Sequence, residues 1–207
     1  MRLLITRPNH DLVTSYLSAW SYDLINLAKE KNFLVTDLKG NLASKQKFES
    51  YLQKQKIDLV FLNGHGNERL VTGFKNEPLV EADANEKILN DCIVHALSCE
   101  SSLELGPKSV KHGTKAYFGY KFPFTFITEK SNECRPFHDK FANIFKEPAI
   151  EVPKCLLNGK SLRESYEKGI ETYKQALLLK SISLTDKESE QVRFALFLNM
   201  KGLTLDS

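Results

Sequence analysis

A histidine and a cysteine stand at matching places in this 207-residue chain. His65 lies between two glycines, directly after the apolar run DLVFLN at 58–63. Cys99 directly follows a second apolar run, IVHALS at 93–98. An imidazole that removes the proton of a thiol turns it into a nucleophile that attacks carbonyl carbon. The two residue types therefore suggest nucleophilic catalysis, provided that the fold brings their side chains together.

Apolar runs alternate with helix-like patterns along most of the chain, and these elements must position the two residues. In residues 10–31 the apolar side chains recur every three or four positions, as on one face of a helix. The alternation predicts an α/β fold with a mostly parallel central sheet. The expected strands are 2–6, 33–38, 58–63, 93–98 and 116–120. The expected helices are 10–31, 42–56, 84–90, 101–112, 134–146, 160–179 and 186–199, with a hairpin or irregular segment at 67–82 and a loop at 122–129.

The chain has no internal repeat, low-complexity tract or linker, which predicts a single domain over residues 1–207. Its apolar fraction of 42% and charged fraction of 27% are typical of a soluble globular protein. A net charge of +3 is too small to indicate nucleic acid or a membrane as a partner. The first residues lack the apolar core of a signal peptide. We therefore expect a cytoplasmic protein with reduced thiols at Cys92, Cys99, Cys134 and Cys155.

The two candidate residues are expected at one edge of the sheet. Active sites of parallel sheets lie beyond the carboxyl ends of the strands. If 58–63 and 93–98 are neighbouring strands, about 4.8 Å apart, His65 and Cys99 emerge together. A helix that begins after Cys99 would favour the thiolate through its dipole. The N–H groups of Gly66 and Cys99 would form an oxyanion hole, while Gly64 and Gly66 would permit unusual backbone angles around His65.

Two short motifs resemble those of the caspase-like (clan CD) superfamily of cysteine peptidases. They are HG at 65–66 and ALSCESS at 96–102. In that superfamily, which includes caspases, legumain, gingipains, separases and bacterial CHAT domains, one strand ends in His-Gly and the next ends in the nucleophilic cysteine. The segments 155–169 and 197–205 resemble the closing part of CHAT and gingipain-like domains, so the likeness covers most of the chain. The resemblance implies a three-layer caspase-like sandwich with helices on both faces of the sheet.

The resemblance also implies roles for the candidate residues. Cys99 would attack the scissile carbonyl of a protein or peptide substrate and form a thioester acyl-enzyme. His65 would act as general base and acid, and Gly66 would help to hold the oxyanion. Such a thiol protease would be controlled by a regulatory protein partner. A catalytically silent caspase-like module within a larger assembly is the alternative.

The substrate specificity differs from that of the best-known relatives. Several relatives carry a polar or charged residue two positions before the nucleophile, where this chain has Leu97. An acidic side chain from the segment after the histidine could instead select Arg or Lys in the substrate, and the candidates are Glu68, Glu81 and Asp83. The interval of 34 residues between the two site residues is shorter than in caspases, which favours the bacterial branches.

Other chemistry finds little support in the sequence. Cys92, His95 and Cys99 have a spacing found among zinc ligands, but a strand between the cysteines would separate their Cα atoms by about 23 Å. We therefore expect His95 to be a strand histidine with satisfied hydrogen bonds. No G-x-S-x-G, G-x-G-x-x-G or Walker A motif is present, so we expect no serine hydrolase, metal or cofactor. Residues 120–126 could form a substrate-binding wall or pack over the sheet edge. The remaining histidines are expected on helix surfaces or at helix ends: His10, His112 and His138.

Overall fold

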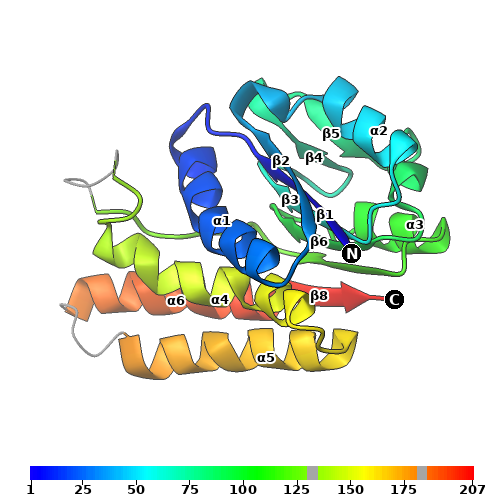
Figure 1. Cartoon of the computed structure of the whole chain (residues 1–207). Helices are drawn as coiled ribbons and strands as arrows, with labels where there is room; N and C mark the ends of the chain where they lie inside the picture. The colour runs from blue at the N-terminus through cyan, green and yellow to red at the C-terminus, as the bar shows by residue number, and fades with distance from the viewer. Residues whose placement is uncertain (130–134, 181–185) are drawn as a thin grey trace.

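The computed structural model describes residues 1–129, 135–180 and 186–207. Within these residues a six-stranded sheet has the strand order β2-β1-β3-β6-β7-β8 (Figure 1). Every neighbouring pair is parallel except β7 and β8, which are antiparallel. The prediction of an α/β fold with a mostly parallel sheet is confirmed. The strands are β1 (Arg2–Arg7), β2 (Leu34–Lys39), β3 (Leu59–Asn63), β6 (Ile93–Leu97), β7 (Ala116–Tyr120) and β8 (Leu203–Asp206).

Helices connect most of the strands, and a small hairpin follows β3. The helices are α1 (Leu12–Glu30), α2 (Lys45–Lys54), α3 (Leu105–Lys111), α4 (Lys140–Leu157), α5 (Leu162–Gln175) and α6 (Asp186–Gly202). The hairpin pairs β4 (Leu70–Thr72) with β5 (Pro78–Glu81), as one of the two expectations for 67–82 proposed. The short helix expected at 84–90 is a single 3₁₀ turn at Glu86–Leu89. No helix in the described part of the chain is long and apolar enough to cross a membrane.

The two faces of the sheet bury separate apolar cores, because successive strand side chains point to opposite faces. Leu3 and Ile5 of β1 pack with residues of α1, α4 and α6 in one core. Leu4 packs with Phe48 of α2, with the β4–β5 hairpin and with Leu105 of α3 in the other. Figure 1 shows these two groups of elements on either side of the sheet. The strands β1, β3, β6 and β7 are thus buried on both faces, which explains their continuous apolar runs.

One predicted helix ends at the wrong residue, and one strand was not predicted. The helix expected to end at 146 continues as α4 to Leu157, although it contains Pro148 and Pro153. A proline lacks the N–H that an inner helical turn needs, but both prolines are buried, and α4 packs on α1 and α5. Residue 134, the expected start of this helix, lies outside the described residues. The strand β8 was not predicted at all.

Candidate functional site

The ends of β3 and β6 place His65 and Cys99 at matching positions on the sheet edge. The two strands are parallel neighbours, and Asn63 pairs with Leu97 at their carboxyl ends. His65 and Cys99 each follow two residues later. The hydrogen bond from Gly64 N–H to the Leu97 carbonyl, at 3.4 Å, continues the strand pairing into the turn. The expectation that these strands are neighbours is therefore correct.

The two loops are in direct contact at Gly66. A Cβ atom built on Gly66 would overlap Ser98 Oγ and lie 2.6 Å from the Leu70 carbonyl oxygen. A Cβ on Gly64 would likewise overlap the Thr72 carbonyl oxygen. Neither glycine has a positive φ angle. The expectation that they permit unusual angles is wrong: glycine is required here because the neighbouring backbone leaves no space for a side chain.

His65 has a carboxylate partner that the sequence did not reveal. Its Nε2 atom lies 2.7 Å from Asp11 Oδ2, and its side chain is 38% exposed. An ionised carboxylate only accepts hydrogen bonds. His65 Nε2 therefore carries the hydrogen and donates it to Asp11. In the neutral ring this leaves the lone pair on Nδ1, the atom that can accept a proton.

Asp11 is held in place as the N-cap of α1. Its Oδ1 accepts hydrogen bonds from Thr14 N–H and Thr14 Oγ1, each at 2.8 Å, and the two residues form a capping box. Partial burial acts to raise the pKa of Asp11, but the hydrogen bonds from Thr14 and His65 outweigh it, so the pKa is lowered. The carboxylate is therefore ionised at neutral pH and oriented toward His65.

The sequence did contain a signal for Asp11. The residue directly follows the segment after β1 and precedes a strong helical pattern, which is the position of an N-cap. Because β1 is the neighbour of β3 in the sheet, its following loop reaches the turn that carries His65. Asp11 can be recognised as a candidate site residue only when the strand order is known.

Cys99 is half-buried and is not activated by a helix. Its Sγ lies 3.9 Å from the Phe124 carbonyl oxygen. Burial raises the pKa of the thiol; the contact with Phe124 acts to lower the pKa and the charge of Glu100 acts to raise it further. The helix expected directly after Cys99 begins only at Leu105. The predicted dipole effect is wrong, because Glu100 adopts a left-handed conformation, with φ 55°, that interrupts a helical path.

His65 and Cys99 are not hydrogen-bonded to each other in the part of the chain that the structure describes. The backbone beside them is nevertheless free to bind a ligand atom. Among the described residues, the N–H groups of Gly66 and Cys99 donate no hydrogen bond. These are the two groups that the sequence predicted for an oxyanion hole. Their availability is compatible with that role.

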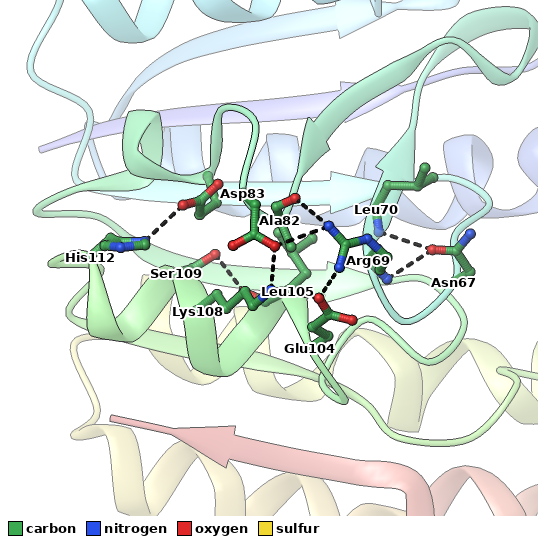
Figure 2. A network of polar contacts seen from close by, with 11 residues as sticks. Asn67, Arg69, Leu70, Ala82, Asp83, Glu104, Leu105, Lys108, Ser109 and His112 are labelled. Atoms are coloured by element: carbon green, nitrogen blue, oxygen red, sulfur yellow. Dashed lines mark hydrogen bonds and ion pairs between the residues drawn. The ribbon is translucent and has the colours of Figure 1, made fainter.

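An ion-pair network ties the His65 loop to the Cys99 loop. Figure 2 shows Arg69 reaching the Ala82 carbonyl oxygen, Asp83 and Glu104. Lys108 of α3 contacts the same two carboxylates, including Glu104 Oε1 at 2.6 Å. Because Arg69 follows His65 and Glu104 follows Cys99, the network links the two segments on the outer side of the site.

This network also affects the question of specificity. Asp83, one candidate for selecting a basic substrate residue, already binds Arg69 and Lys108. The hydrogen bond from Lys108 is the main cause of the lowered pKa of Asp83. The backbone of Glu68 accepts a hydrogen bond from Leu105 N–H at 2.9 Å, while its side chain is exposed. Asp83 is thus the least suitable of the three acids, and the choice between Glu68 and Glu81 stays open.

The surroundings of Cys92 and His95 give no support to the hypothesis of a zinc site. No cluster of His, Cys, Asp and Glu that could hold a metal ion occurs among the described residues. Cys92 Sγ donates to the Ile57 carbonyl at 3.2 Å, and burial raises the pKa of Cys92 to about 12. His95 is a buried strand residue, and burial lowers its pKa to about 3. Its Nε2 has no hydrogen-bond partner within the described chain, so the expectation of satisfied hydrogen bonds is wrong for that atom.

The other histidines and cysteines lie in varied surroundings. His112 is the C-cap of α3, as expected for a helix end, with Nδ1 2.7 Å from Glu86 Oε1. His138 is exposed in the turn before α4. His10 is not a surface residue: its side chain is only 12% exposed and lies beside Asp11. Cys155 is buried in α4, and Cys134 lies outside the described residues.

The aromatic segment mainly packs against the fold. Phe124 and Phe126 contact Trp20, with ring centroids 6.5 and 5.0 Å away. Phe126 also packs on Tyr16. Phe122, by contrast, is exposed. Packing over the sheet edge therefore accounts for most of this segment, although the Phe124 carbonyl places it next to Cys99.

A groove of about 900 Å³ lies elsewhere, between α4 and α5. Positively charged lysines and negatively charged glutamates line it, together with Cys155 and Tyr166. Neither His65 nor Cys99 contributes to it. We give more weight to the strand ends than to this groove, because they combine a cysteine, a histidine with a carboxylate partner and N–H groups that donate no hydrogen bond among the described residues.

The sequence matches no protein-family model and no curated protein at a significant level. The resemblance of its two motifs to caspase-like peptidases therefore stays a prediction. What the chain can do chemically must be argued from the geometry of Asp11, His65 and Cys99.

Proposed function

We propose that the chain is a cysteine endopeptidase of caspase-like type. In this proposal the six-stranded sheet and the helices on its two faces form a three-layer caspase-like sandwich. The mostly parallel strand arrangement and the two separate cores support it. The substrates are proteins or peptides, and the enzyme acts in the cytoplasm.

One observation carries the proposal. His65 and Cys99 follow adjacent parallel strands at matching register, and Asp11 binds Nε2 of the imidazole. A base that is oriented by a third group and stands beside a nucleophile is the arrangement that nucleophilic catalysis requires. Asp11 leaves Nδ1 of His65 as the proton acceptor.

The reaction follows from these roles. His65 Nδ1 takes the thiol proton as Cys99 Sγ attacks the scissile carbonyl carbon. The N–H groups of Gly66 and Cys99 bind the resulting oxyanion. His65 then gives its proton to the leaving amine, and the C–N bond breaks to leave a thioester on Cys99. Water, deprotonated by His65, hydrolyses the thioester and releases the second product.

The raised pKa of Cys99 gives the free enzyme a resting thiol rather than a thiolate–imidazolium pair. Proton transfer to His65 then has to accompany substrate binding, because hydrogen bonds in a catalytic site often tighten only in the complex. A regulatory protein partner that reduces the burial of Cys99 would lower its thiol pKa, because burial is the main cause of the raised value. We include such a partner in the proposal.

The test uses the purified chain, a library of internally quenched peptides with varied residues before the cleaved bond, and a matching pool of peptidyl acyloxymethyl ketones. The proposal predicts cleavage of a subset of peptides and a covalent ketone adduct at Cys99 by mass spectrometry. His65→Ala should lower both, whereas the matched control His138→Ala should not. A folded protein, by circular dichroism, that cleaves nothing and forms no adduct would refute a peptidase that acts without its regulatory partner.

The second candidate is a catalytically silent caspase-like module. The absence of a hydrogen bond between the described residues His65 and Cys99, together with the raised thiol pKa, favours it. Such a module would form no ketone adduct at Cys99. The same experiment therefore separates the two candidates.

A further inference from the structure

Two imidazoles approach the same oxygen of Asp11. Oδ2 lies 2.7 Å from His65 Nε2 and 3.4 Å from His10 Nε2. The ring centroids of the two histidines are 6.3 Å apart, at a steep angle of 72°. Oδ1 of the same carboxylate is already held by Thr14. Both carboxylate oxygens of Asp11 thus have polar neighbours. Of these neighbours, His10 is a residue to which the proposed mechanism assigns no role.

His10 occupies a built environment. Its Nε2 lies 3.2 Å from Asn76 Oδ1, and its ring packs on Phe74 with centroids 5.5 Å apart. Nδ1 is buried and has no hydrogen-bond partner in the described part of the chain. The Asp11 carboxylate accepts hydrogen bonds, which fits an N–H on His10 Nε2 and a carbonyl oxygen of Asn76 facing it. His10 Nε2 is thus hydrogen-bonded to Asn76 Oδ1, and the same nitrogen makes a longer polar contact with Asp11 Oδ2.

Asn76 is presented by a strained segment. Lys75 and Asn76 have φ angles of 55° and 61°, in the left-handed region that residues other than glycine rarely adopt. The segment is fixed at both ends, since Phe74 N–H donates to the Ala43 carbonyl and Gly73 N–H to the Glu77 carbonyl, each at 2.8 Å. Backbone strain of this kind persists where the surroundings impose it, and here it brings the Asn76 amide to His10.

We propose that His10, held by Asn76, is a positioning residue for the Asp11–His65 pair. Its Nε2–H adds a second polar contact to Asp11 Oδ2 and limits rotation of the carboxylate. Asp11 then keeps accepting from His65 Nε2–H, and Nδ1 remains the proton acceptor of the ring. This inference rests on the proposed peptidase function, because the pair has a catalytic role only there.

Two substitutions of His10 separate positioning from packing. His10→Phe keeps a ring against Phe74 but removes both nitrogen atoms. His10→Gln keeps an N–H donor near the position of Nε2. We expect His10→Phe to lower kcat about threefold to tenfold, the loss typical of one hydrogen bond, with little change in KM. His10→Gln should recover most of it. Equal kcat in wild type and His10→Phe, or equal losses in both variants, would overturn the proposal.

A double-mutant cycle tests the link to Asn76. If Asn76 acts through His10, Asn76→Ala should reduce kcat, and the His10→Phe/Asn76→Ala double variant should be no worse than His10→Phe alone. Asn41→Ala, which changes an exposed asparagine of the Gly40–Leu42 turn, serves as the matched control and should behave like wild type. Additive losses would contradict a shared pathway through His10.

A spectroscopic measurement makes the test independent of peptide cleavage. The proton on His65 Nε2 should give a downfield ¹H NMR signal that disappears in Asp11→Ala. We expect this signal to broaden in His10→Phe and to persist in His10→Gln. An unchanged signal in His10→Phe would refute positioning by His10, whereas loss of cleavage or of ketone adducts in the wild type would refute the peptidase itself. The two failures are therefore distinguishable.

Discussion

The chain contains two histidine–cysteine pairs, and they lie in opposite environments. His95 lies in β6, and Cys92 directly precedes this strand. Each residue is 2% exposed. Burial lowers the pKa of His95 to about 3 and raises that of Cys92 to about 12, so both are uncharged at neutral pH. His65 and Cys99 lie beyond the strand ends, where His65 is 38% exposed and has Asp11 as a partner.

The difference shows that position in the sheet sets the burial and the polar partners of each histidine and cysteine. A side chain within a parallel sheet is enclosed by the layers above and below it. A side chain just past the carboxyl end meets loops, solvent and unpaired N–H groups. Residue type alone does not distinguish Cys92 from Cys99. The predictions below change one pair while leaving the other intact.

Loss of the nucleophile should have the largest effect. Cys99→Ser should lower peptide cleavage by more than about 10³-fold, because the serine hydroxyl is a much weaker nucleophile in a site built for a thiol. Cleavage of the preferred quenched peptide is the measurement. Cys92→Ser is the matched control. Its folded fraction should cleave the peptide at the rate of the wild type. Equal losses of activity in the two variants would show that Cys99 is not the nucleophile.

Loss of the Asp11 charge should come next. Asp11→Asn should lower kcat at least about tenfold, because a neutral amide no longer selects the Nε2–H tautomer of His65. Asparagine caps helices as well as aspartate does, so α1 should stay intact. The measurement is kcat together with the circular dichroism spectrum. A variant with unchanged kcat would show that the contact at 2.7 Å has no part in catalysis.

The pH dependence of Cys99 tests its resting state. Burial raises its pKa above the ordinary value of 9.0, so the thiol predominates at neutral pH. Only the thiolate is alkylated. The alkylation rate of Cys99 in the free protein should therefore rise about tenfold per pH unit between about pH 6 and about pH 8. Iodoacetamide labelling of Cys99, followed by mass spectrometry, measures this rate. A plateau that is already reached near pH 6 would indicate a stabilised thiolate instead.

Gly66 should be sensitive in stability as well as in activity. Gly66→Ala introduces a Cβ that overlaps Ser98 Oγ, and we expect a loss of about 1–3 kcal/mol in the free energy of unfolding. Gly202→Ala is the control, since its Cβ would meet neighbours at ordinary distances of 3.5 Å and more. Urea unfolding curves compare the two. Equal stabilities would mean that the two loops are farther apart than described.

The Arg69 network should contribute least. Arg69→Gln removes the ion pairs of Arg69 with Asp83 and Glu104, but Lys108 still contacts both carboxylates, and exposed ion pairs are weak and are screened by salt. We expect less than about a fivefold fall in cleavage rate. Activity of the wild type in about 1 M salt should approach that of the variant, since the Debye length is then about 3 Å. A loss as large as that of Asp11→Asn would make the network part of the site itself.

Much of the arrangement of the sheet could be predicted from the sequence. Continuous apolar runs identified the buried strands, and the rule for strand ends predicted that His65 and Cys99 follow neighbouring strands at one edge of the sheet. Asp11 was missed because its role depends on β1 being the neighbour of β3, which local patterns do not contain. The strand β8 was missed because it is short and directly follows α6.

The error at the helix after Cys99 was avoidable in part. Pro107 fits the first turn of a helix, where its missing N–H is tolerated, so a start near Leu105 was readable from the sequence. The left-handed turn at Glu100 was not, because a glutamate gives no local signal for it. The roles of Gly64 and Gly66 likewise depend on backbone contacts between segments that are distant in the sequence.

The most direct test of the comparison is the rate of iodoacetamide labelling at each cysteine of the folded protein near pH 7, resolved by mass spectrometry. The account predicts that Cys99 reacts at least about tenfold faster than Cys92, and that the two rates converge in urea. Similar rates at Cys99 and Cys92 in the folded protein would contradict it.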